Sequence, residues 1–196
     1  MKLYQALTLI GFLALTSCQP NQQSNENNDT THQHQASEAT PDNSKKVLSP
    51  RLQTMANIGD VHVHIDYSSP GKRGRTIWNG LVAYGQVWVT GAHKATSIEF
   101  SEDVTIQGKT IPKGKYAFFT IPDASTWTLI INKNHEQHLA DDYDAQQDVV
   151  RVDVTPEKLE ETVESLTYKV IPQSDKQGFI SVAWDDLEVR LPIEVQ

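Results

Sequence analysis

Histidine is the residue whose placement in this sequence could do the most chemistry. The chain has seven histidines, and six of them fall in close pairs. His62 and His64 lie two positions apart in residues 61–67, a run that alternates apolar and polar side chains as a half-buried β-strand does. Because residues i and i+2 of a strand point to the same face, the two imidazoles are expected to project side by side.

Neutral imidazoles at this spacing can share one Cu or Zn ion when another strand or loop supplies a third ligand. His93 is the candidate for that third ligand. Asp66 is the candidate for a further oxygen donor, or for a carboxylate that orients a histidine. The alternative hypothesis is a solvent-facing polar strand that carries unrelated histidines.

A basic loop could hold an anionic ligand. Residues 68–75 bring Lys72, Arg73 and Arg75 together among glycines, and arginine binds carboxylates and phosphates through two parallel hydrogen bonds. Trp78 follows in a loop-like stretch, and it is the aromatic residue expected to be exposed enough to stack on a ligand such as a sugar. The simpler interpretation is that Arg73 or Arg75 packs over the sheet and pairs with acidic side chains, since the net charge is -8.

Catalytic motifs are lacking: the sequence has no Gly-x-Ser-x-Gly, no His-Glu-x-x-His and no phosphate-binding loop. Asp141, Asp142, Asp144 and Asp148 suggest a hard cation, but the spacing of a calcium loop is missing, which favours a solvated acidic loop. No basic stripe is available to neutralise phosphates, so nucleic acid is excluded as a partner. These features indicate a binding module rather than an enzyme.

The N-terminus has the pattern of an export signal. Lys2 gives it a positive start, and the apolar run 6–15 is too short to span a bilayer. The sequence Leu15-Thr16-Ser17-Cys18 resembles the lipobox of bacterial lipoprotein signal peptides. That resemblance implies cleavage before Cys18, acylation of Cys18 and stable attachment to a membrane through the lipid chains. The mature chain would then have no thiol, which excludes disulfides and a blue-copper site.

Composition divides the chain into three segments. Residues 1–17 are predicted to be the signal peptide, and residues 18–46, polar and without aromatic side chains, a disordered tether that begins at lipidated Cys18. Residues 47–196 are numerous enough to form a single hydrophobic core. The expected location is the bacterial cell envelope, with the lipid-anchored domain on the periplasmic or surface face of the outer membrane.

Short β-type runs recur through residues 47–196 and are separated by Gly, Pro, Asn and Asp. A tight turn is expected at residues 107–109, an acidic loop or short helix at 135–147, and one helical turn at 156–161. No long run has the period of a helix, so the predicted fold is an antiparallel β-sandwich of jelly-roll or immunoglobulin-like type. The expected strands are 61–67, 86–90, 96–100, 104–106, 110–111, 115–121, 127–131, 148–154, 166–170, 179–184 and 187–191.

Several motifs resemble those of one protein family. They are Tyr67-Ser-Ser-Pro70, Lys72-Arg-Gly-Arg75, Leu81-Val-Ala-Tyr-Gly-Gln-Val-Trp88, Thr90-Gly-Ala92, Ala95-Thr96, Pro112-Lys-Gly-Lys-Tyr116, Ile121-Pro122 and Asp148-Val-Val-Arg151. Residues 48–193 are similar to the domain of unknown function 2911, found in exported bacterial proteins, many of them lipoproteins. The resemblance implies one exported β domain and supplies no catalytic residues. His93 replaces an asparagine of the commoner family pattern, and His62 and His64 replace non-histidine residues, as a metal site peculiar to a subgroup would require.

The sequence therefore predicts a lipid-anchored envelope protein whose β domain binds a small ligand or a Cu or Zn ion. The alternative of another class is a structural or interaction module that docks a protein or a glycan in the envelope. An enzyme of unrecognised type is the third, least favoured hypothesis.

Overall fold

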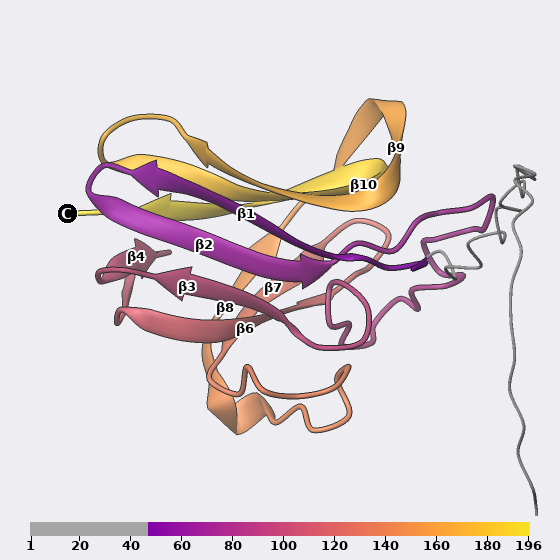
Figure 1. The fold of residues 1–196 in the computed structure, drawn as a ribbon, viewed down its shortest axis with the longest axis horizontal. Helices are drawn as coiled ribbons and strands as arrows, with labels where there is room; N and C mark the ends of the chain where they lie inside the picture. The colour runs from indigo at the N-terminus through magenta and orange to yellow at the C-terminus, as the bar shows by residue number, and fades with distance from the viewer. Residues whose placement is uncertain (1–46) are drawn as a thin grey trace, which may run out of the picture. The chain divides into compact units, whose positions relative to one another are not determined.

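The computed structural model describes residues 47–196, which belong to one compact unit (Figure 1). The predicted signal peptide, the predicted tether and Cys18 lie outside these residues. None of the described residues forms a helix long and apolar enough to cross a membrane. The elements are β1 (Arg51–Ile58), β2 (Val61–Ser68), β3 (Thr96–Phe100), β4 (Val104–Ile106), β5 (Lys109–Ile111), β6 (Gly114–Ile121), β7 (Trp127–Asn132), the 3-10 turn η1 (Ala145–Gln147), β8 (Asp148–Val154), β9 (Glu157–Pro172) and β10 (Gln177–Glu194).

The strands form two antiparallel sheets. One sheet has the order β1-β2-β3-β6-β7-β8, and the other has the order β5-β4-β10-β9. Edge strand β1 lies against β9 of the other sheet, and Figure 1 shows β1 running alongside β9 and β10. The predicted all-β class, with two antiparallel sheets, is confirmed.

The core lies between the sheets and takes its side chains from both. On β2, the apolar residues of the alternating run are buried, while His62 is exposed and His64 and Asp66 are half-buried. This alternation is the one that the sequence predicts. The largest fully buried side chains include Trp127 of β7 and Trp184 of β10. The polar side of β2 therefore faces outward, on the face of the sheet away from this core.

A second, smaller apolar cluster covers the other face of the six-stranded sheet at β6 and β7. Phe119 and Ile130 of these strands are fully buried there. Val89 and Ala95, from the segment before β3, and the half-buried Tyr143, from the segment before β8, complete the contact. Because both faces of β6 and β7 are covered, their sequences are almost continuously apolar.

Four expectations about strands are wrong or incomplete. Residues 86–90 are not a strand, since only Trp88 forms a single bridge, with Thr120. Residues 156–161 belong to β9 rather than to a helical turn, and the three expected strands between 166 and 191 are parts of the longer β9 and β10. Strand β1 has no counterpart among the expected strands. In the last three cases pairing with a neighbouring strand, which single-sequence patterns do not contain, decides the conformation.

Candidate functional site

The structure separates the three predicted histidine ligands. His62 and His64 share the outer face of β2, whereas His93 lies in the loop before β3, where its carbonyl accepts a hydrogen bond from the backbone N–H of Leu139 at 2.6 Å. No three His, Cys, Asp or Glu side chains come together as a metal site anywhere in residues 47–196. The predicted site of His62, His64 and His93 is therefore not assembled.

Asp66, the predicted oxygen donor, is engaged in an ion pair. Its Oδ1 lies 2.5 Å from Nε of Arg51 on the neighbouring strand β1. The same guanidinium donates to the carbonyls of Lys94 and Ala95 at 3.2 and 3.3 Å. Asp66 therefore holds Arg51 in place, and Arg51 ties the loop before β3 to the sheet edge.

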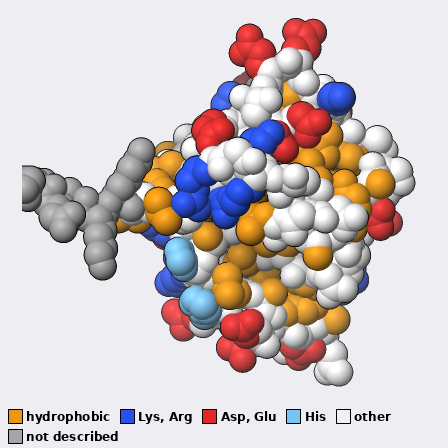
Figure 2. Space-filling view, turned by 90° about the vertical axis from the view of Figure 1, so that its right-hand side faces the viewer, with side chains coloured by type: hydrophobic (Ala, Val, Ile, Leu, Met, Phe, Trp, Pro, Cys, Tyr) orange, Lys and Arg blue, Asp and Glu red, His pale blue; other side chains and the backbone are white. Residues whose placement is uncertain are grey.

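The predicted basic loop borders a cleft of about 300 Å³ at another place in the domain. Arg73 and Arg75 line it together with Trp88 and Trp184. Leu81 and Leu139 also line it, with exposed fractions of 49% and 38%. On the face shown in Figure 2, a group of Lys and Arg side chains borders hydrophobic side chains. The cleft thus combines positive charge with an apolar wall.

Arg75 is held by the backbone of its own loop. Its Nε donates to the carbonyl of Lys72 at 3.0 Å, and its Nη2 donates to the carbonyl of Gly71 at 2.5 Å. Lys72 forms an ion pair with Asp185, and the hydrogen bond in this pair raises the pKa of Lys72. Asp185 therefore pairs with Lys72 and does not neutralise the positive charge of Arg75.

Arg73 is the second cation of the cleft. Its backbone N–H donates to Oε1 of Glu164 at 2.7 Å. Its guanidinium makes no hydrogen bond or ion pair with any of residues 47–196. The simpler interpretation, in which Arg73 or Arg75 pairs with an acidic side chain, therefore applies to neither within this part of the chain.

All four tryptophans of the chain form one cluster at the cleft. The Trp88 and Trp184 rings, which line it, stack with their centroids 5.8 Å apart. Trp78 packs edge-on against Trp127 at 4.8 Å. The sequence predicts an exposed Trp78, but this residue is half-buried and supports the two lining rings instead of lining the cleft itself. Its contacts with the other indoles, formed by distant parts of the chain, explain the difference.

Unusual backbone conformations occur around the cleft. Arg73 and Leu139, which line it, have φ angles of 51° and 52°. Thr90, between two lining residues, has a φ of 49°, which is an outlier for a β-branched side chain. Conformations of this kind persist only where the surroundings enforce them, and they are frequent at functional sites.

The surroundings of Thr90 enforce its conformation through hydrogen bonds. Its Oγ1 donates to the carbonyl of Trp88 at 3.1 Å and lies 3.0 Å from Oγ1 of Thr120. Its carbonyl accepts from Thr96 Oγ1 at 3.0 Å and from the Tyr168 hydroxyl at 2.7 Å. Complete burial raises the pKa of Tyr168, so its hydroxyl keeps the proton that it donates. The loop bordering the cleft is thus fixed in one conformation.

A family model described as Protein of unknown function (DUF2911) matches residues 49–193. The chain belongs to this family. The family resemblance predicted from the motifs is therefore confirmed. No curated protein and no solved structure matches the chain. In this DUF2911 domain, the quoted motifs that contain Pro70, Arg73, Arg75, Trp88 and Gly91 all contribute to the lining of the cleft.

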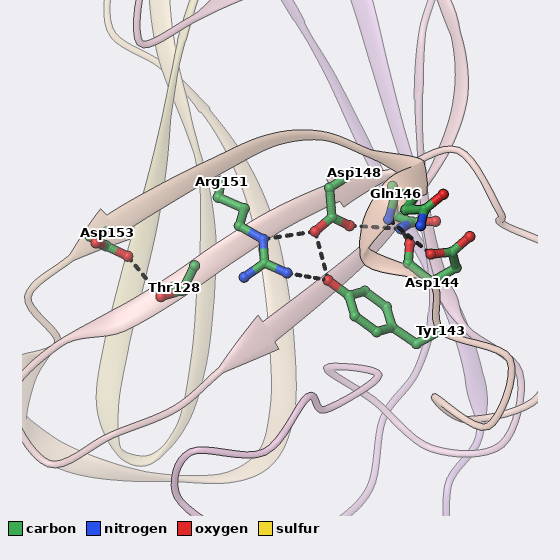
Figure 3. Close-up of polar contacts among 8 residues, drawn as sticks. Thr128, Tyr143, Asp144, Gln146, Asp148, Arg151 and Asp153 are labelled. Carbon is green, nitrogen blue, oxygen red and sulfur yellow. Dashed lines mark hydrogen bonds and ion pairs between the residues drawn. The ribbon is translucent and has the colours of Figure 1, made fainter.

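Another motif of the DUF2911 domain forms a polar network on β8 (Figure 3). Asp148 Oδ2 accepts from the Tyr143 hydroxyl at 2.6 Å and from Nε of Arg151 at 2.7 Å. Arg151 Nη2 also donates to the Tyr143 hydroxyl at 2.7 Å. Burial, followed by the hydrogen bond to Asp148, raises the pKa of Tyr143 to about 12, so the phenol stays protonated. These residues tie the segment before β8 to the sheet.

The sequence identifies the two arginines of the DUF2911 cleft but not most of its wall. No sequence pattern marks Leu81, Leu139 or the half-buried Trp88 as wall residues, whereas Trp184 belongs to the core and is only 1% exposed. The leucines stand out only by their unusual exposure, and this exposure is visible in the folded chain but not in the sequence. For Trp88, the half-buried position follows from the failure of residues 86–90 to form a strand.

Proposed function

We propose that this DUF2911 domain is a non-catalytic binding module that holds a small anionic ligand with an apolar body. The observation that carries the proposal is that Arg73, whose guanidinium has no partner among residues 47–196, lines the same cleft as Trp88 and Trp184. A guanidinium can bind a carboxylate or a phosphate through two parallel hydrogen bonds. Trp88, Leu81 and Leu139 supply apolar surface for the rest of the ligand, and the buried Trp184 backs the Trp88 ring.

The side chains of the cleft support binding rather than catalysis. Its polar side chains within the described residues are those of Ser49, Arg73 and Arg75. None of these is a general base at neutral pH, because an arginine stays protonated and a serine needs a neighbouring base to act as a nucleophile. The volume of about 300 Å³ is at the lower limit of small-molecule sites, which favours a ligand of modest size.

We also propose that the domain works at the bacterial cell envelope, anchored through lipid on Cys18. The support is the lipobox-like sequence before Cys18, which lies outside the described residues. Docking of a protein or a glycan is the alternative, and the candidate platform for a glycan is an exposed Trp78. The half-buried Trp78 favours the anion-binding cleft over glycan docking.

The proposal is tested by titrating 3-phenylpropionate into the full-length chain and following tryptophan fluorescence, since two of the four indoles line the cleft. We expect saturable binding of 3-phenylpropionate or of phenyl phosphate, and none of the neutral 3-phenylpropanamide. Arg73→Gln should abolish it, and Arg73→Lys should restore it only in part because a lysine lacks the paired donors.

The matched control is Arg190→Gln. Arg190 is also exposed, but it pairs with Glu188 on β10 and does not line the cleft. This variant should bind the probes as the parent chain does. Equal binding of the charged and neutral probes, no saturation with either anion, or unchanged binding in Arg73→Gln would contradict the proposed function.

A further inference from the structure

The outer face of β1, β2 and β3 carries a second group of side chains that is separate from the cleft. Met55 of β1 is directly opposite His64 of β2 in the antiparallel register, and Asn57 is opposite His62. Met55, His62 and His64 line one surface depression of about 330 Å³. Three side chains with metal-binding atoms therefore converge on one place.

The exposure of Met55 is not explained by packing. It is one of two methionines in the chain, the other being Met1, and 52% of it is exposed although methionine is normally a core residue. It lies on an edge strand and belongs to neither apolar cluster. A thioether at the surface, facing the histidine-bearing strand, is available as a ligand.

Hydrogen bonds prepare His62 for metal binding. Its Nδ1 lies 2.8 Å from Oδ1 of Asn57, and an amide oxygen can only accept, so the proton is on Nδ1 and the lone pair is on Nε2. Histidines that bind metals are usually oriented by such a contact at the other ring nitrogen. The backbone N–H of His62 donates to Oγ of Ser101 at 2.8 Å, which fixes the strand at this point. The His64 ring has no hydrogen-bond partner among residues 47–196, so it is free to turn toward an ion.

The spacing fits one ion. Directly opposed residues in an antiparallel pair have Cβ atoms about 4.5–5.5 Å apart, and residues i and i+2 of a strand are about 6.6 Å apart. We infer that Met55, His62 and His64 form a Cu(I) site. A thioether is a soft ligand that selects Cu(I), and imidazole also suits copper, whereas Zn gains little from the sulfur.

This ligand set differs from the one predicted by sequence, because a methionine replaces His93. It is compatible with the lack, within the described residues, of any group of three His, Cys, Asp or Glu side chains that could hold a metal. Glu99 is opposite His64 and lines the same depression, but it does not complete such a group. The third ligand is therefore sulfur.

Affinity for Cu(I) is measured without oxygen by competition with bicinchoninate. The full-length chain carries Cys18→Ser, His32→Gln and His34→Gln, so that the upstream thiol and histidines do not compete. We expect one Cu(I) per chain. Met55→Leu, and separately His62→Gln with His64→Gln, should weaken binding by at least the roughly 10–100-fold that follows loss of a supporting partner. Zn affinity should be the same in Met55→Leu as in the parent.

Two matched variants distinguish this ligand set from others. His93→Gln, and His135→Gln with His138→Gln, should bind Cu(I) as the parent does. Arg73→Gln should also bind Cu(I) normally, so this site and the anion cleft can fail independently. Because Met55 is exposed on an edge strand, leucine at this position is expected to leave folding intact.

Ligation by sulfur has its own spectroscopic readout. With ¹³C-methyl methionine the chain gives two methyl signals, and Met55→Leu identifies the one from Met55. One equivalent of Cu(I) should shift the Met55 signal and leave the Met1 signal unchanged. An unshifted Met55 signal, unchanged Cu(I) affinity in Met55→Leu, or an equal loss in His93→Gln would overturn the inference.

Discussion

At the scale of single residues, the backbone of Thr90 is held by a hydrogen-bond donor that is distant in the sequence. The Tyr168 hydroxyl donates to the Thr90 carbonyl at 2.7 Å from a fully buried position. Tyr168→Phe removes this donor, and we expect the free energy of unfolding to fall by about 1–2 kcal/mol, as for loss of a buried hydrogen bond. Urea unfolding measures this change.

The matched control for Tyr168→Phe is Tyr67→Phe. Tyr67 is buried and packs against Tyr168 with ring centroids 4.6 Å apart, but its hydroxyl makes no hydrogen bond within the described residues. Its replacement should change the unfolding midpoint much less. Equal losses in the two variants would mean that the hydrogen bond to Thr90 contributes nothing specific.

The residues of the basic loop show how far a sequence can predict a site. The glycines and cations identify the loop, and two of its arginines do line the cleft. The sequence cannot show that Lys72, rather than an arginine, takes the carboxylate of Asp185, which is 113 residues away along the chain. Nor can it show that Met55 is opposite His64, because that depends on the register between β1 and β2.

At the scale of secondary-structure elements, the strands with alternating or apolar sequences were predictable. β2, β3, β7 and β8 have nearly the predicted bounds, because burial on one or both faces leaves a pattern in the sequence. The start of β9 is rich in charged residues and has no such pattern. It forms a strand because β10 pairs with it across irregularities near Asp185, and this partner is invisible to local propensity.

Contact between two turns provides a test at this scale. Gly59, in the β1–β2 turn, has a φ of 55°, and a Cβ there would lie 2.2 Å from the carbonyl oxygen of Asp175 in the β9–β10 turn. Gly108, in the β4–β5 turn, has a φ of 74°, but a Cβ there would meet no atom of the described residues within 4 Å. The two glycines thus share a left-handed backbone and differ in their surroundings.

We expect Gly108→Ala to lower the free energy of unfolding by about 1–2 kcal/mol, the cost of an L-residue in the left-handed region. Gly59→Ala should lose this amount and about 1–3 kcal/mol more, because the Asp175 backbone must move. Thermal or urea unfolding of both variants measures the difference. Similar losses in the two would show that the turns of the two sheets are not held in contact in solution.

At the scale of the whole molecule, the two proposed sites use different parts of one sheet framework. The copper ligands lie on regular strands, where register fixes their spacing. The cleft is formed largely by irregular segments, where hydrogen bonds to the Thr90 carbonyl and the tryptophan cluster replace regular pairing. Loops supported by a rigid scaffold are a common place for binding residues. This division explains why the anion cleft was harder to predict than the strand face.

The lipid anchor is tested on the whole chain. Expressed in a bacterium that processes lipoproteins, the chain should incorporate labelled palmitate and enter the detergent phase of a Triton X-114 partition. Two or more acyl chains are needed for stable anchoring, because one chain gives only reversible binding. Cys18→Ser should lose the label and move to the aqueous phase, whereas Ser17→Ala, which keeps the cysteine and a small residue before it, should behave as the parent does. Detergent partitioning that persists in Cys18→Ser would contradict anchoring through this residue.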